Sequence, residues 1–263
     1  MQRAMIGLVS KTLNEWFVGL GSITVLVSEL FRSLFSRKPD FRQLIYQIYF
    51  VGVKSQSVVL ITGAFTGMVL CAQTYFQFHK VKMDTATMAV VSVSMCSELG
   101  PVLTGLMVAG RVGAAFAAEL GTMRVTEQID ALRALATHPV DYLIVPRFCA
   151  TMIAMPLLAA ESIAVGILAG YTVGVMLLGI DPAYLFHNML RYTQGVDLII
   201  GLTKSSIFGG IIAIVSCYKG MSCPNGAEGV GRATTEAVVY ASISILISNF
   251  FLTLFLTALF PGT

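Results

Sequence analysis

A few charged side chains lie inside long apolar stretches of this chain, and they are its best candidates for chemistry. Glu98 lies within the apolar run 85–118, and Lys204 lies within the run 198–218. An unpaired ionisable group in lipid costs several kcal/mol, so such groups normally face a cavity or a partner. We therefore expect Glu98 and Lys204 to belong to a binding site or an ion path. Whether the two pair directly stays open.

The sequence around Glu98 also predicts a break in its helix. Gly100 and Pro101 follow at once, and proline has no N–H to donate to the carbonyl of Ser97, so the helix should kink there. A broken helix beside a carboxylate is typical of transporter cavities. The alternative is a purely structural kink, with Glu98 protonated or bonded to a neighbouring helix.

The remaining intramembrane charges have weaker interpretations. Lys204 would suit the phosphate of an anionic lipid headgroup as a point charge. Arg111 lies near the inner end of its run, where its long stem can reach the interface, so we interpret it as an anchor. Glu161 interrupts the third apolar run, and the pattern predicts no role for it.

Residue types that usually catalyse reactions or bind metals do not occur here in any known motif or spacing. The five cysteines contain no CxxC pair, and the three histidines lie far apart. There is no HExxH motif and no nucleophile–base set. We expect no metal, no catalytic residue and no nucleic-acid partner.

A phosphate-binding loop for ATP is missing as well. The closest string, at 105–111, lacks the Gly-Lys-Ser/Thr ending and lies in an apolar run. We therefore expect no cofactor on this chain. ATP and Mg²⁺ would be bound by a separate ATPase, unless an ion gradient supplies the energy.

The composition is that of an integral membrane protein. The chain is 56% hydrophobic and 12% charged, whereas soluble domains are about 25% charged. A helix needs about 20 apolar residues to cross the hydrocarbon core. The apolar runs predict one all-α membrane domain over 1–263 with five transmembrane helices, at about 53–78, 85–118, 143–180, 198–219 and 235–260.

The residues before the first span have an amphipathic pattern. Apolar residues recur every three or four positions from Ile6 to Leu34, which places them on one helical face. This spacing predicts an interfacial helix over 5–36. The alternative is a signal peptide with its apolar region at 16–27, although Glu15 and Glu29 flank that region and no A-x-A cleavage site follows.

The distribution of Lys and Arg predicts the orientation. If the loop after the first span is outside, the inner segments 1–54, 119–147 and 219–232 carry twelve of the seventeen Lys and Arg residues. The positive-inside rule then places the N-terminus in the cytoplasm and the C-terminus outside.

A polar segment over 119–138 joins the second and third spans. Its pattern predicts one amphipathic helix, with Ile129 and Leu132 on the apolar stripe. Two pairs at i, i+3 spacing are expected on the polar side: Arg124–Glu127 and Asp130–Arg133. We interpret this segment as a coupling helix seated in a cytoplasmic ATPase, and a bare surface helix is the alternative.

Glycines spaced by four occur in two spans, at Gly63 and Gly67 and again at Gly166 and Gly170. Such spacing lets helix backbones approach closely. We favour packing within one chain over a dimer interface.

Short motifs distributed over most of the chain resemble those of one family, the MlaE (YrbE) type permeases of bacterial lipid ABC transporters. The resemblance runs from about residue 39 to 259. The motifs are ELGP at 98–101, AGR at 109–111, AE at 118–119, MR at 123–124, TEQ at 126–128, PRF at 146–148 and GRATT at 231–235. The resemblance implies a multi-pass protein of the bacterial inner membrane with a periplasmic C-terminus. A plastid inner envelope is the less favoured location.

The resemblance also implies partners and site residues. Such permeases are homodimers that bind two copies of a cytoplasmic ABC ATPase and an outer ring of MCE-domain protein, and in many members a STAS-domain protein binds the ATPase. Glycerophospholipid passes through a cavity between the permease copies. Lipid contacts are expected at Leu70, Thr74, Gln77, Phe78, Glu98, Leu99 and, from its charge, Lys204. ATPase contacts are expected at Glu119, Met123, Arg124, Thr126, Glu127, Gln128 and Asp130.

These observations predict a non-catalytic permease subunit of an ABC-type phospholipid transporter. It would move lipid between the membrane and an MCE-protein conduit. The alternative is an ion-coupled carrier or channel that uses Glu98 and Lys204.

Overall fold

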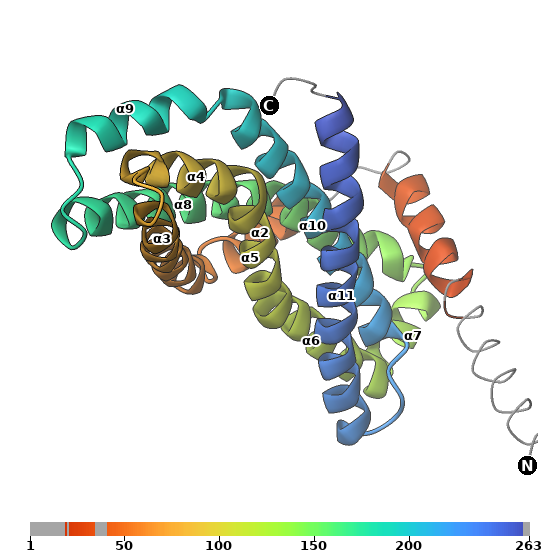
Figure 1. The fold of residues 1–263 in the computed structure, drawn as a ribbon. Coiled ribbons are helices and arrows are strands. Elements are labelled where there is room, and N and C mark those ends of the chain that lie inside the picture. The colour runs from red at the N-terminus through yellow and green to blue at the C-terminus, as the bar shows by residue number, and fades with distance from the viewer. Residues whose placement is uncertain (1–18, 20, 35–40, 260–263) are drawn as a thin grey trace, which may run out of the picture.

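The computed structural model describes residue 19 and residues 21–34 and 41–259, and every long element among them is a helix. Residues 21–34 are helical, and the named elements follow in chain order (Figure 1). They are α2 (Phe41–Val51), α3 (Gln56–His79), η1 (Asp84–Ala86), α4 (Thr87–Ser94), η2 (Met95–Leu99), α5 (Gly100–Val108), η3 (Ala109–Gly113), α6 (Ala114–Val125), α7 (Gln128–Ala134), η4 (Val140–Ile144), α8 (Val145–Met176), α9 (Pro182–Tyr192), α10 (Gly195–Met221) and α11 (Ala227–Leu259).

Five helical stretches of the described chain are long and apolar enough to cross a membrane. They are Phe41–His79, Asp84–Val125, Val140–Met176, Gly195–Met221 and Ala227–Leu259. The predicted all-α membrane fold class is confirmed. The second stretch continues to Val125, beyond the expected end near residue 118, because α6 begins within the apolar run and continues without a break into the more polar residues that follow.

Helices α3 and α8 pack closely along their glycines. A Cβ atom added at Gly67 would collide with the carbonyl group of Gly166, and one added at Gly63 would lie 2.6 Å from the Ser162 Oγ atom. Glycine is therefore required for this backbone contact. For these two helices, the preferred interpretation of packing within one chain is confirmed.

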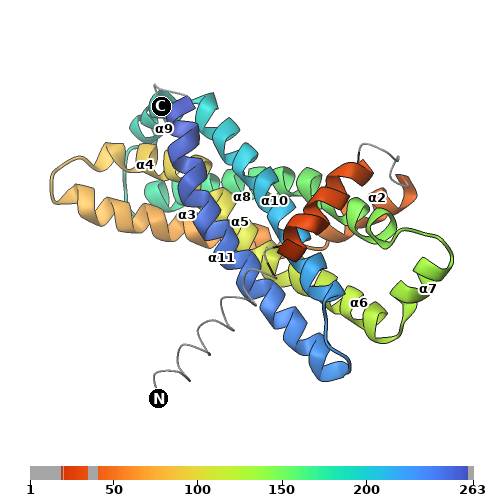
Figure 2. The same cartoon turned by 90° about the vertical axis from the view of Figure 1, so that its right-hand side faces the viewer.

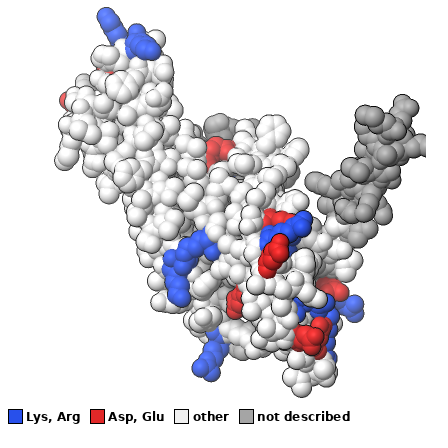
Figure 3. Space-filling view, turned by 90° about the horizontal axis from the view of Figure 1, so that it is seen from below, with Lys and Arg blue, Asp and Glu red and all other residues white. Residues whose placement is uncertain are grey.

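Helix α10 is the central element. It packs against α8, α11 and α6, and Figure 2 shows it alongside α11. The buried side chains Phe116, Phe208 and Ile212 belong to one apolar cluster that joins these helices. Seen from below, the surface is mostly uncharged, and its acidic and basic side chains gather in a few separate groups (Figure 3).

Two expected helices differ from the structure or lie partly outside it. The segment 119–138 is not one helix, because Glu127 adopts a left-handed backbone conformation with φ of 58° between α6 and α7. A left-handed residue cannot continue a right-handed helix. The expected interfacial helix 5–36 is described only at residue 19 and over 21–34, and its other residues lie outside the described ones.

Helix α9 was not expected. It begins after Asp181, whose side chain accepts a hydrogen bond of 2.8 Å from the Ala183 N–H and caps the helix. Tyr184, Phe186 and Leu190 are exposed on it. The helix is too short to span a membrane, so apolar content alone gave no signal for it.

Candidate functional site: a polar network on a π-turn

Glu98 lies on a π-helical turn, η2, within the second span. Gly100 donates its N–H to the carbonyl of Met95, five residues earlier, and Pro101 begins the next α-helical turn. The break predicted from Pro101 is therefore a π-turn, which widens the helix by one residue and is often found at functional sites.

Lys204 of α10 reaches this turn and is completely buried. Its Nζ atom donates to the carbonyl oxygen of Ser97 at 3.1 Å and to Glu98 Oε1 at 2.6 Å. The Ser97 carbonyl is the acceptor that Pro101 cannot serve in an α-helix. Lys204 thus supplies the hydrogen bond that the Ser97 carbonyl loses at the break. Lys204 and Glu98 also form a direct ion pair, which the sequence had left open.

Close approach of α10 makes this reach feasible. A Cβ atom at Gly201 would collide with the carbonyl oxygen of Cys96 and would lie 3.1 Å from Pro101 Cγ. Only glycine allows the two backbones to meet there. Lys204 follows one turn later on the same face.

Helix α11 contributes two further residues that the sequence analysis did not single out. Asn249 donates from Nδ2 to Glu98 Oε2 at 3.0 Å. Thr253 Oγ1 accepts from Lys204 at 2.9 Å and lies within donating distance of both Glu98 Oε1, at 3.0 Å, and the Asn249 carbonyl, at 2.8 Å. A single hydroxyl proton serves one of these acceptors at a time. The sequence feature that could have identified Asn249 and Thr253 is that they are two polar residues one helical turn apart within an apolar run.

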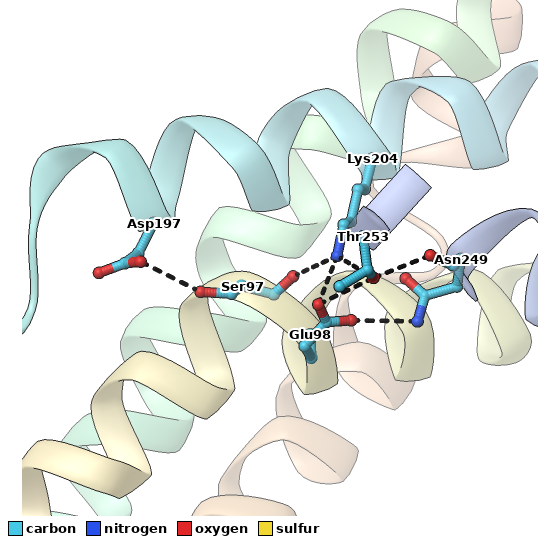
Figure 4. A network of polar contacts seen from close by, with 6 residues as sticks. All are labelled: Ser97, Glu98, Asp197, Lys204, Asn249 and Thr253. Carbon is cyan, nitrogen blue, oxygen red and sulfur yellow. Dashed lines mark hydrogen bonds and ion pairs between the residues drawn. The ribbon is translucent and has the colours of Figure 1, made fainter. Parts of the chain in front are cut away.

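The network extends to a second carboxylate, that of the buried Asp197 (Figure 4). Ser97 Oγ donates to Asp197 Oδ1 at 3.4 Å, and the Gln194 N–H donates to Asp197 Oδ2 at 2.9 Å. The drawn network therefore holds two carboxylates and one ammonium group. It links the second, fourth and fifth spans by polar contacts inside an apolar region.

Exposure separates the roles of the two central residues. The Glu98 side chain is 36% exposed, whereas that of Lys204 has no exposed surface. Lys204 therefore positions Glu98 and does not itself present a charge at the surface, contrary to its expected direct contact with lipid. Glu98 is the charged group that a bound molecule can reach here.

The other expected lipid residues are divided between two environments. Leu70 and Leu99 are partly buried against the same apolar cluster, which includes Cys71, Met88 and Met95. Thr74 and Phe78 are also partly buried, whereas Gln77 is exposed. The structure therefore brings Leu70 and Leu99 to one cluster beside the turn that carries Glu98.

The expected coupling residues lie at the end of the second span. Glu119 pairs with the buried Arg147 at 2.8 Å, and Met123 packs against an apolar cluster. Arg124 pairs with Asp130 at 3.0 Å across the break, which replaces the expected pair with Glu127. Five of the expected coupling residues are exposed: Glu119, Thr126, Glu127, Gln128 and Asp130.

The expected pair of Asp130 with Arg133 is present, at 3.1 Å. Ile129 is buried and Leu132 packs against the same cluster, as the apolar stripe predicted. The two short helices are thus tied together by charge and held to the body by apolar contacts.

Three remaining predictions concern isolated groups. Arg111 donates to Ser55 Oγ at 2.7 Å, so it ties the second span to the start of α3 and is not only an interface anchor. The Oε2 atom of Glu161 is buried without a hydrogen-bond partner among the described residues. No group of three potential metal ligands occurs in the described part of the chain.

The five cysteines are all free. Cys223 lies in the loop between α10 and α11, where burial raises the pKa of its thiol. Its thiol therefore stays protonated at neutral pH.

Comparison with known proteins shows which family this chain is similar to. The family model described as "Permease MlaE" matches residues 44–255. A "Probable ABC transporter permease protein" of Rickettsia conorii is 48% identical over 218 residues, which cover 82% of this chain and 84% of that protein. A protein of Synechocystis with the same description is 41% identical over 96% of this chain and 95% of its own length.

A plant protein is also similar. The chloroplastic protein TRIGALACTOSYLDIACYLGLYCEROL 1 of Arabidopsis thaliana is 36% identical over 234 residues, which cover 89% of this chain and 67% of that protein. The name of this plant protein contains that of a lipid, trigalactosyldiacylglycerol.

Proposed function

The chain belongs to the MlaE permease family and is a multi-pass ABC transporter permease, and we propose that it moves glycerophospholipid between the membrane and an MCE-protein conduit. Its membrane would be the bacterial inner membrane, with the N-terminus in the cytoplasm and the C-terminus in the periplasm. The resemblance, the positive-inside distribution and the lipid in the name of the plant relative support this proposal.

One observation carries the lipid assignment, namely the partly exposed carboxylate of Glu98 beside apolar side chains. Lys204, Asn249 and Thr253 hold that carboxylate in one position. Leu99 follows it directly and shares an apolar cluster with Leu70. Ligand sites combine a few fixed polar groups with a largely apolar wall, and a phospholipid has both kinds of surface.

Energy would come from a separate ABC ATPase, which would bind ATP and Mg²⁺. The exposed turn at Thr126–Gln128 is the surface we assign to that contact, because it projects from helices fixed to the body by Ile129 and by the Glu119–Arg147 pair. A homodimer, an outer MCE ring and a STAS-domain protein on the ATPase complete the proposed assembly.

The test is to capture lipid by photocrosslinking at matched leucines. A photoreactive residue replaces Leu99 beside Glu98, and in a second variant it replaces Leu168, which is 63% exposed on α8. After extraction into detergent, Leu99 should capture phospholipid more strongly than Leu168, because a cavity retains lipid that a bare helix face loses. Equal capture at both positions would mean surface lipid only.

The ion-coupled alternative is tested in the same preparation. Vesicles that contain the permease without its ATPase should show no ion-driven lipid movement. Lipid movement that follows a proton gradient and is lost in Glu98→Gln would favour the carrier instead.

A further inference from the structure

A cavity lies away from the Glu98 network, between α2, the end of α6, η4 and the start of α8. It has a volume of about 390 Å³. Its walls include Arg42, Gln47 and Tyr142, together with the ion pair of Glu119 and Arg147. None of these residues takes part in the network around Lys204.

Arg147 is the central polar group of this cavity. It is only 4% exposed, and its guanidinium donates to the Leu143 carbonyl at 2.6 Å and pairs with Glu119 at 2.8 Å. The guanidinium carbon also lies 5.5 Å from the centre of the Phe116 ring. Its Nε–H has no hydrogen-bond partner among the described residues.

Gln47, which also lines the cavity, likewise has an unpaired polar atom. Its Oε1 atom is buried and accepts no hydrogen bond from the described part of the chain. A buried donor or acceptor left unpaired costs free energy. The residues that line the cavity thus include Arg147 and Gln47, each with a buried polar atom that has no partner among the described residues, and a second cation, Arg42.

The position of the cavity indicates the kind of ligand. Helix α2 is amphipathic, and Phe41, Ile45 and Tyr49 are exposed on it. An apolar helix face of this kind lies in the membrane interface. Tyr46 and Tyr142 line the cavity and are 61% and 45% exposed, and tyrosine is enriched at headgroup depth.

We propose that this cavity binds the phosphate-bearing headgroup of a phospholipid from the leaflet next to α2. Two arginines and one glutamate line it, so its charged side chains sum to one positive charge, and arginine donates in the geometry that phosphate oxygens accept. Gln47 would accept from a hydroxyl or ammonium group of the same headgroup.

This site is separate from the transport site and touches the coupling segment. Glu119 and Met123 both line the cavity, and both lie just before the turn assigned to the ATPase. A bound headgroup would therefore fix the base of that segment, so that the lipid composition of one leaflet affects the contact with the ATPase.

The experiment uses the full-length permease in vesicles of phosphatidylcholine, with or without phosphatidylglycerol. A photoreactive residue replaces Tyr142, and a matched one replaces Tyr184, an exposed tyrosine of α9. Tyr142 should label phosphatidylglycerol in preference to phosphatidylcholine. The preference should fall about tenfold in Arg42→Gln, because a charge-assisted hydrogen bond is lost, while labelling at Tyr184 should not change.

Three controls make the result decisive. Arg191→Gln removes an arginine of α9 and should leave labelling at Tyr142 unchanged. Glu98→Gln should also leave it unchanged, which separates this site from the transport site. Displacement of the labelled lipid by inorganic phosphate would assign the site to soluble phosphate. Equal labelling of both lipids at Tyr142, unaffected by Arg42→Gln, would overturn the proposal.

Discussion

The Lys204 ammonium group lies 3.1 Å from the Ser97 carbonyl oxygen. In a regular α-helix the N–H of residue 101 would donate to this carbonyl, but Pro101 has no N–H. Lys204, more than a hundred positions away in the sequence, thus donates the hydrogen bond that the backbone of the second span lacks. The same ammonium group holds Glu98 at 2.6 Å. The break in the helix and the fixed carboxylate are therefore two results of one contact.

Removal of Lys204 should destabilise the protein. Lys204→Met removes the donor of the Ser97 carbonyl and the cation that pairs with Glu98, which keeps only the neutral donors Asn249 and Thr253. Loss of one partner of a buried pair costs about 3–5 kcal/mol. Because the Glu98 side chain is 36% exposed, we expect a loss at the lower end, of about 3 kcal/mol. Thermal unfolding of the purified protein in detergent measures this loss.

A double variant checks the cause of that loss. Lys204→Met combined with Glu98→Leu removes both charges, and replacing a buried pair by apolar groups is often close to neutral. The double variant should therefore be more stable than Lys204→Met alone. If both unfold at the same temperature, the ion pair is not the source of the loss.

Gly67 should tolerate no side chain. Gly67→Ala forces α3 away from Gly166 of α8, and such overpacking costs about 1–3 kcal/mol. The matched variant is Gly231→Ala on α11, where an added Cβ has nothing within 4 Å. It should be neutral or stabilising by up to about 1 kcal/mol. Equal thermal stability of the two variants would contradict the close packing of α3 and α8.

The carboxylate of Glu127 should be needed for recovery of the ATPase. Glu127→Lys reverses its charge at an exposed turn, and we expect less copurifying ATPase with unchanged permease abundance in the membrane. Glu127→Asn is the matched variant, because asparagine tolerates the positive φ of 58° while removing the charge. Full ATPase recovery with both variants would remove this turn from the interface.

The proposed orientation can be tested with two introduced cysteines. Arg133→Cys lies on α7 and Lys80→Cys lies just after α3, and both positions are exposed. An impermeant thiol reagent added to sealed cells should label Lys80→Cys and not Arg133→Cys. The native cysteines interfere little, because four of the five are buried. The reverse labelling pattern would invert the topology.

The sequence alone predicted the class of fold, because the signal for a membrane helix is local. Each span is a run of about 20 apolar residues, and five such runs appear as five long helices. The break at Pro101 was also predictable, since a missing N–H is a property of one residue. Glu98 was identified for the same reason, as a charge within an apolar run.

The tertiary structure decided which groups meet. Lys204, Asn249 and Thr253 converge on Glu98 from helices far apart in the sequence, and no local pattern specifies that packing. The break at Glu127 depends on a backbone conformation that is uncommon for glutamate, so periodicity over 119–138 predicted one helix where there are two. Side-chain periodicity identifies faces, whereas close packing of backbones determines which faces come together.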